Sequence, residues 1–325
     1  MTEKTADPQR QTQVQRLLTL RKFPGLADAE IGELAIIAEN VVEQTFPAGA
    51  VVASASRRAP GEKHPDQLFS PSGPALHLVI SGKLGTASGR TWGPHEVCGA
   101  LQAMAGRRTT EDIVAQEETQ TLRLTAADFR EILEDNFGLL SAVRRTLSRE
   151  LVSLSPKPPT QEEAKVLLPE VASDAPLGMV ERLMVLRKRL AFGKGRIEAL
   201  AALSQSADEV RVPARTDLAT LGELPMAVTI ILEGTAQVLR PEGQTVLGPG
   251  NSIGAIEALG ETPFVASITT LTPVRALRFP CTALLDVLED HTDLALAMVE
   301  SLATNLLERV PDASMNVLAE RHQVN

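Results

Sequence analysis

The chain has 325 residues, about twice the length of an ordinary single domain, so two domains are expected. Apolar residues make up 43% of the chain and charged residues 22%, which excludes a wholly disordered protein and leaves enough apolar material for two cores. The net charge of -9 offers no basic surface for a phosphate backbone, and the chain has no Tyr and one Trp. Nucleic acid is therefore not an expected partner.

The cysteine content and the N-terminal sequence bear on where in the cell the protein is located. Cys98 and Cys281 lie far apart, and no CxxC or HxxxH pair has metal-ligand spacing. The first residues are polar, and no apolar run approaches the ~18 residues of a membrane span. We predict a cytoplasmic protein with no metal site and no membrane insertion.

The stretch 155–176 contains five prolines among charged residues and resembles an interdomain linker. This boundary divides the chain into five predicted parts: a disordered N-terminus over 1–14, a first domain over 15–154, a linker over 155–177, a second domain over 178–310 and a C-terminal tail over 311–325.

The first predicted domain begins and ends with helices. Apolar residues at helical spacing predict a helix over 28–40, with Asp28 as a candidate N-cap. Short strands punctuated by Gly and Pro follow, including 46–52 and the strand–Gly–strand run 78–84. The closing helices are predicted over 126–136 and 139–154.

A long insert, 57–74, interrupts these strands and is rich in Pro, Gly and charge. We predict a disordered loop here. The alternative is a partner-binding loop with Leu68 and Phe69 as its apolar anchors.

The second half of the chain repeats this order. A helix is predicted over 197–204, strands over 212–215 and 230–236, and closing helices over 282–290 and 294–310. Gly82 and Gly234 stand 152 residues apart in matching hairpins, and Gly99 and Gly254 stand 155 apart. Landmarks in one order predict two copies of a small β-barrel flanked by helices.

Each copy carries a Gly-Pro pair before a Gly-led short helix. The first copy has Trp92-Gly-Pro-His95 before 97–104, and the second has Leu247-Gly-Pro-Gly250 before 252–259. This arrangement resembles the cyclic-nucleotide-binding domain superfamily, which includes bacterial catabolite activators, protein kinase A regulatory subunits and cyclic-nucleotide-gated channels. The resemblance implies an α+β fold class: two jelly-roll, cupin-like double-stranded β-helix barrels, each flanked by N- and C-terminal helices.

In that family the phosphate-binding cassette uses backbone N–H groups after the Gly, a Glu for the ribose hydroxyl and an Arg for the phosphate. The Glu directly follows the Gly, and the Arg lies four residues before an apolar strand residue. In the second copy these positions are Ala255, after Gly254, and Phe264. The resemblance thus implies that the second cassette is degenerate.

The first cassette departs from the pattern less completely. Ala100 follows Gly99 in place of the Glu, and Thr109 stands at the Arg position, with Arg107 and Arg108 just before it. A cyclic nucleotide, if one binds, would therefore contact Gly99, Ala100, Leu101, Arg107, Arg108 and Thr109. The alternative is that both arginines are solvated turn residues that pair with Glu111 or Asp112.

Two further residues of the second cassette have open roles. The Phe264 ring either plugs the pocket mouth or points outward as an interaction anchor. Glu257 has the wrong spacing to replace the lost Glu, so a capping or surface role is favoured.

No catalytic pattern is present. The five histidines are scattered, and GxSxG, a P-loop Lys and HExxH do not occur, so no enzyme is predicted. The short stretch 311–325 leaves no room for a helix-turn-helix, so DNA binding is not expected. The layout most resembles a kinase regulatory subunit reduced to its two barrels.

We therefore predict a regulatory or scaffold protein that binds protein partners through degenerate barrels. The alternative is a ligand-operated switch whose first domain binds a cyclic mono- or dinucleotide. An apolar stripe in the last closing helix either covers its barrel or forms a homodimer: Leu294, Met298, Leu302 and Leu306.

Overall fold

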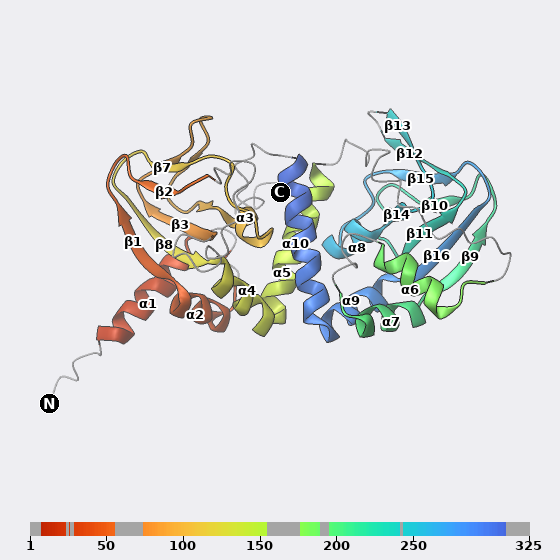
Figure 1. Cartoon of the computed structure of the whole chain (residues 1–325), viewed down its shortest axis with the longest axis horizontal. Helices are drawn as coiled ribbons and strands as arrows, with labels where there is room; N and C mark the ends of the chain where they lie inside the picture. The colour runs from red at the N-terminus through yellow and green to blue at the C-terminus, as the bar shows by residue number, and fades with distance from the viewer. Residues whose placement is uncertain are drawn as a thin grey trace, which may run out of the picture. The chain divides into compact units, whose positions relative to one another are not determined.

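The computed structural model describes residues 8–23, 26, 29–55, 74–154, 176–188, 195–240 and 243–309 (Figure 1). The chain divides into two compact units, residues 1–139 with 303–325 and residues 140–302. The division runs through helices α5 (Phe137–Ser153) and α10 (Thr292–Arg309). Residues 155–175 of the predicted linker and the whole predicted tail lie outside the described residues.

The first unit is a double-sheet barrel that follows helices α1 (Pro8–Leu20) and α2 (Ile31–Asn40). Its antiparallel sheets have the orders β1-β8-β3-β6 and β2-β7-β4-β5. Its strands are β1 (Val42–Phe46), β2 (Val51–Ala53), β3 (Ala75–Ser81), β4 (Leu84–Gly85), β5 (Thr91–Trp92), β6 (Val97–Cys98), β7 (Ile113–Ala115) and β8 (Thr119–Thr125). Helices α3 (Ala100–Met104) and α4 (Ala126–Asp135) complete the repeat before α5.

The second repeat has the same elements in the same order. It begins with α6 (Met179–Arg187) and α7 (Ile197–Gln205), and its sheets have the orders β14-β11-β16-β9 and β10-β15-β12-β13. Its strands are β9 (Asp208–Val212), β10 (Asp217–Ala219), β11 (Ala227–Glu233), β12 (Ala236–Arg240), β13 (Gly243–Leu247), β14 (Ser252–Ile253), β15 (Ser267–Thr270) and β16 (Val274–Pro280). Helices α8 (Ala255–Gly260), α9 (Cys281–Asp290) and α10 close it.

The registers of the two barrels match at their core pairs. Leu84 faces Trp92 in the first barrel, and Ala236 faces Leu247 in the second. All four side chains are buried in the barrel interiors, where apolar residues exclude water. The predicted tandem barrels with flanking helices are thus confirmed.

The hairpin glycines show why the repeat was visible in the sequence. Gly82 and Gly234 have φ of +83° and +85°, in the left-handed region that side chains disfavour. A Cβ on Gly82 would lie 2.4 Å from the Glu118 oxygen, and one on Gly234 would lie 2.2 Å from the Pro273 oxygen. Both turns therefore require glycine.

Several local predictions need correction. Helix α1 begins at Pro8, so the prediction of disorder over 1–14 is wrong from that residue onward, and neither α1 nor α6 was predicted. Helix α2 begins at Ile31 after Glu30, whose backbone N–H donates to the Glu33 carboxylate at 3.0 Å. Asp28 and residues 56–73 of the predicted insert lie outside the described residues.

The apolar stripe of α10 is buried within a single chain. Leu294, Met298, Leu302 and Leu306 are each at most 5% exposed. The stripe therefore packs within the chain, and a homodimer through the closing helices stays a prediction.

Candidate functional site

The two cassettes start from the same backbone geometry. Gly99 and Gly254 each have φ of +81° and directly precede the short helices α3 and α8. A Cβ on Gly99 would lie 2.5 Å from the Ala75 oxygen, and one on Gly254 would lie 2.9 Å from the Ala227 oxygen. The glycines are thus fixed by close backbone approach to β3 and β11 as well as by φ.

In the second cassette the Phe264 ring lies inside the barrel. Its side chain is 7% exposed and belongs to the apolar core of that barrel. The ring Cζ lies 3.4 Å from the point where a Cβ on Gly254 would stand. The ring therefore packs against the glycine that opens the cassette helix, and the outward-pointing alternative is wrong.

Backbone hydrogen bonds hold Phe264 at this place. Its N–H donates to the Glu223 oxygen at 2.9 Å, and its carbonyl accepts from the Gly222 N–H at 2.9 Å. These bonds tie the residue to the loop between β10 and β11 on both sides. They fix the backbone of Phe264, and packing in the barrel core holds the ring inside.

Glu257 is half-buried in the first turn of α8, and the capping or surface role expected for it stays a prediction. Burial raises the pKa of its carboxyl, and the charge of Arg240 opposes this shift. Burial also raises the pKa of the Cys281 thiol, and the negative charge of Glu257 adds to this shift against the opposing Arg278. A thiol with a raised pKa is a poor nucleophile at neutral pH.

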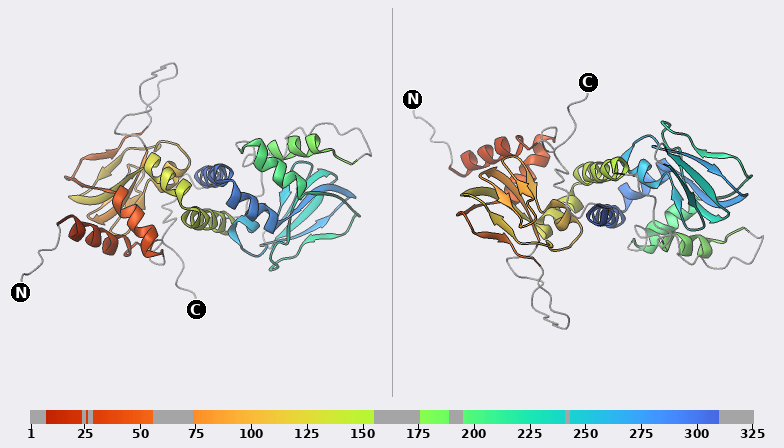
Figure 2. Two further views of the ribbon diagram at one scale, coloured as in Figure 1. Left: turned by 90° about the horizontal axis from the view of Figure 1, so that it is seen from below. Right: turned by 90° about the horizontal axis from the view of Figure 1, so that it is seen from above.

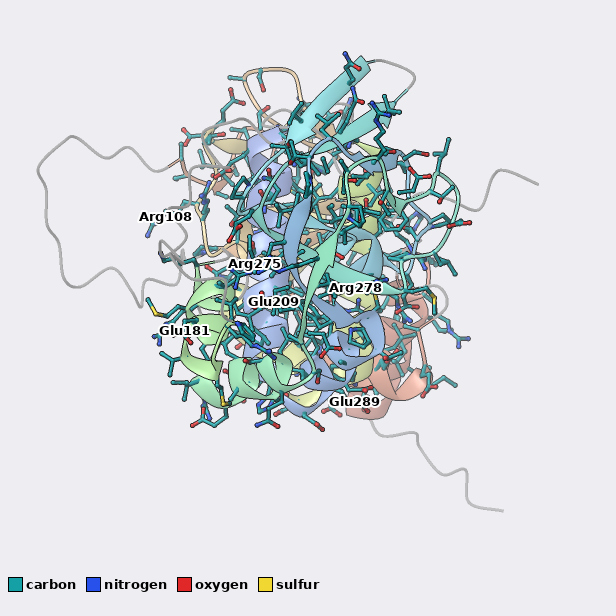
Figure 3. The ribbon with its side chains drawn as sticks, turned by 90° about the vertical axis from the view of Figure 1, so that its right-hand side faces the viewer. Arg108, Glu181, Glu209, Arg275, Arg278 and Glu289 are labelled. Atoms are coloured by element: carbon teal, nitrogen blue, oxygen red, sulfur yellow. The ribbon has the colours of Figure 1, made fainter. Side chains whose placement is uncertain are left out.

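The first cassette brings together fewer of its candidate residues. Ala100 and Leu101 are buried, at 4% and 6% exposure. Thr109 is half-buried, and its hydroxyl donates a long hydrogen bond of 3.5 Å to the Ser54 oxygen. Arg108 is exposed and projects from the surface (Figure 3).

Arg107 pairs with a residue that sequence reasoning missed. Its Nη2 lies 3.2 Å from the Glu308 carboxylate of α10, and both side chains are about half exposed. Glu111 instead accepts a hydrogen bond from the Ser88 hydroxyl at 2.7 Å, and Asp112 accepts one from the Ala55 N–H at 2.7 Å. The expected pairing of Arg107 with these two acids is therefore wrong.

A cavity of about 610 Å³ lies beside this cassette. Hydrogen bonds from Ser88 and Thr86 lower the pKa of Glu111, one of its two acidic lining residues. The lining contains no basic side chain: Ala55, Gly85, Thr86, Ala87, Glu111, Asp112, Val114 and Gln116. A phosphate would meet two carboxylates here, so this cavity does not suit a nucleotide.

A buried histidine lies inside the first barrel. His77 is 4% exposed, its Nδ1 lies 3.3 Å from the Thr121 hydroxyl, and its ring packs edge-on against Phe46. Burial lowers the pKa of His77 to about 4, and Arg123 adds to the shift. The apolar run of β3 around His77 could have indicated that this position is buried, but its partner could not be read from the sequence.

Within the described ranges, no group of three or more His, Cys, Asp or Glu side chains could hold a metal ion. A search of the same residues finds no helix with the length and apolar character needed to span a bilayer.

Residues 209–291 match the family model of the cyclic nucleotide-binding domain. The second repeat has this fold. The first repeat has the same strand order and the same core register, so the chain carries two domains of the cyclic-nucleotide-binding type in tandem. A search of curated proteins finds no match to this chain.

Several solved structures are similar to this chain. The regulatory domain of Toxoplasma gondii PKA with cAMP is 13% identical, with 94% of this chain and 98% of that chain covered and a TM-score of 0.32. The regulatory subunit of a cAMP-independent protein kinase A from Trypanosoma brucei is 14% identical, with coverages of 94% and 91% and a TM-score of 0.34. The sensor domain of the transcriptional regulator DNR from Pseudomonas aeruginosa is 26% identical, with coverages of 42% and 96% and a TM-score of 0.37.

Proposed function

We propose that this chain is a non-enzymatic regulatory protein whose second domain has lost cyclic-nucleotide binding and serves protein–protein interaction. The observation that carries the proposal is the Phe264 ring, packed against Gly254 in the apolar core of the second barrel. An apolar ring occupies the position from which the family extends a cation to the phosphate. The second barrel is thus a closed structural module.

The energetics support this proposal. A cyclic phosphate that enters a barrel must exchange its hydration for hydrogen bonds and a cation. Ala255 offers no carboxylate for a ribose hydroxyl, and Phe264 offers neither charge nor donor. Each charge-assisted contact that is lost costs about 2 kcal/mol, so tight binding of the usual messenger is not expected.

The alternative function is a ligand-operated switch in the first domain. The polar side chains His77 and Thr121 inside that barrel favour it over a similar role for the second domain. The arginines weigh against it, because Arg107 is engaged by Glu308 and Arg108 projects from the surface. We therefore propose protein partners for both domains, in the cytoplasm, without a DNA-binding role and without a cofactor.

The deciding experiment is a calorimetric titration of the full chain with cyclic AMP, cyclic GMP and cyclic di-GMP. We expect no binding at millimolar ligand. Micromolar binding that Phe264→Ala alters and Arg108→Ala does not would overturn the proposal for the second domain. Binding that Arg108→Ala abolishes and Phe264→Ala leaves intact would establish the switch in the first domain instead.

A further inference from the structure

The cassette helix of the second repeat ends against α5. Both α8 and the part of α5 from Leu140 onward belong to the second unit, and Figure 2 shows them next to each other. Arg144 donates to the Leu259 carbonyl and, at 3.2 Å, to the Glu261 carboxylate. Arg149 Nε donates to the Gly260 carbonyl at 2.9 Å. The last carbonyls of α8 thus receive guanidinium donors from α5.

The two helices fit closely at this end. A Cβ on Gly260 would lie 3.2 Å from the Ser148 Cβ and 3.3 Å from the Arg149 nitrogen. Arg144 is 3% exposed and also donates to the Ser141 hydroxyl at 3.1 Å. Leaving a buried guanidinium without partners is costly, and its donors have fixed directions. The contact between the two helices is therefore restricted to one geometry.

The backbone at Glu261 is strained, and the arginines hold it. Glu261 has φ of +52°, a left-handed conformation that is uncommon for a residue other than glycine. Its carboxylate lies 3.2 Å from Arg144 Nη2 and 3.5 Å from Arg145 Nη1. Such strain persists where the surrounding contacts stabilise it.

The first cassette does not have this arrangement. At an offset of 155 residues, the three arginines of α5 correspond to Val299, Glu300 and Thr304 of α10, and Glu261 corresponds to Gly106. One contact from α10 to the first cassette, within the first unit, is the exposed pair Arg107–Glu308. Exposed pairs contribute little to stability, so this pair does not match the buried arginine contacts of the second cassette.

We propose that Arg144, Arg145 and Arg149 form an arginine clamp by which α5, and not a bound nucleotide, fixes the position of the second cassette. A displacement of α5 is then passed directly to α8 and to the loop that carries Phe264. This inference rests on the proposed function, in which the second barrel has no nucleotide to hold its cassette. It makes α5 the internal partner that sets the state of the second domain.

The test is hydrogen exchange of the full chain, read at the hydrogen-bonded amides of Ala258, Glu261 and Thr262. In Arg144→Ala we expect these amides to exchange about tenfold faster or more, while those of α3 keep their rate. Arg149→Ala should give a smaller increase at the same amides. Arg130→Ala, at an exposed position of α4, is the matched control and should change neither cassette.

Unchanged exchange of α8 in folded Arg144→Ala and Arg149→Ala would overturn the clamp. Glu261→Gln serves if Arg144→Ala does not fold, since it keeps the side-chain shape and removes the charge; it too should accelerate exchange at the end of α8. A nucleotide found in the second cassette would refute the proposed function. The exchange rates of the α8 amides in the arginine variants would still show whether α5 holds the cassette.

Discussion

The two barrels share a strand order but differ in what lines them. At matching register positions the first barrel has Gln44 facing Thr121, and the second has Val210 facing Ala276. Phe264 further fills the second interior, while the residue at the corresponding position of the first, Thr109, lies half-buried against a backbone carbonyl. Two barrels with the same strand order can therefore have interiors of different polarity, because the lining residues and not the strand order set it.

The largest expected loss of stability comes from removing the Phe264 ring from the core of the second barrel. Phe264→Ala should destabilise the second unit by about 4 kcal/mol, because it removes buried ring surface and leaves a cavity. The matched change in the first barrel, Thr109→Ala, should cost less than about 1 kcal/mol. Trp92, the single tryptophan, reports unfolding of the first barrel by fluorescence, and circular dichroism reports both units. Equal costs for the two variants would contradict a difference in packing between the two barrel interiors.

A buried ion pair also distinguishes the second barrel. Arg275 Nε lies 2.5 Å from the Glu209 carboxylate and Arg275 Nη1 lies 2.9 Å from that of Glu233; Figure 3 labels Arg275 and Glu209 close together. Arg275→Ala should cost about 3 kcal/mol, because the buried Glu209 loses its partner. Gln120→Ala, the corresponding change in the first barrel, should cost much less in the same denaturant unfolding experiment. A cost below 1 kcal/mol for Arg275→Ala would place the pair among ordinary surface contacts.

Acid should destabilise the first unit more than the second, because the buried histidine lies in the first barrel. His77 has a pKa of about 4 in the folded state against 6.5 unfolded, so between these values the unfolded chain binds the extra proton. The stability that the neutral ring contributes is complete above pH 6.5 and falls by up to about 3 kcal/mol as the pH drops to 4. Trp92 fluorescence during denaturation at pH 7 and pH 4.5 measures this loss. His77→Gln should flatten the dependence, and an unchanged slope in that variant would assign it to other groups.

The smallest effect tests what the two cassettes share. Gly99→Ala and Gly254→Ala should each cost about 1–2 kcal/mol, because both glycines have φ of +81° and no room for a Cβ. Gly32→Ala in α2 is the control: no atom lies within 4 Å of its added Cβ, so a neutral or slightly stabilising result is expected. Thermal unfolding of the three variants measures these differences. If Gly99→Ala costs nothing, the backbone of the first cassette does not need the left-handed conformation that it shares with the second.

Sequence alone determined the repeat, the barrel class and the substitutions in the cassettes. The repeat depends on local physics: strand alternation and glycines in left-handed turns such as Gly82. The cassette positions counted from Gly254 come from the resemblance to the cyclic-nucleotide-binding family. Helices α1 and α6 were missed because their apolar residues form no strong stripe, as the exposed Val14, Leu18 and Val180 illustrate.

The pairing of residues far apart in the sequence could not be predicted and is known from the tertiary structure alone. Phe264 could have pointed in or out, and its inward direction is set by packing of the ring in the barrel core. Arg144 meets Glu261 across 117 residues, and Arg107 meets Glu308 across 201. No local pattern encodes such pairs, because their energy arises only when the chain brings two separate surfaces together and excludes water between them.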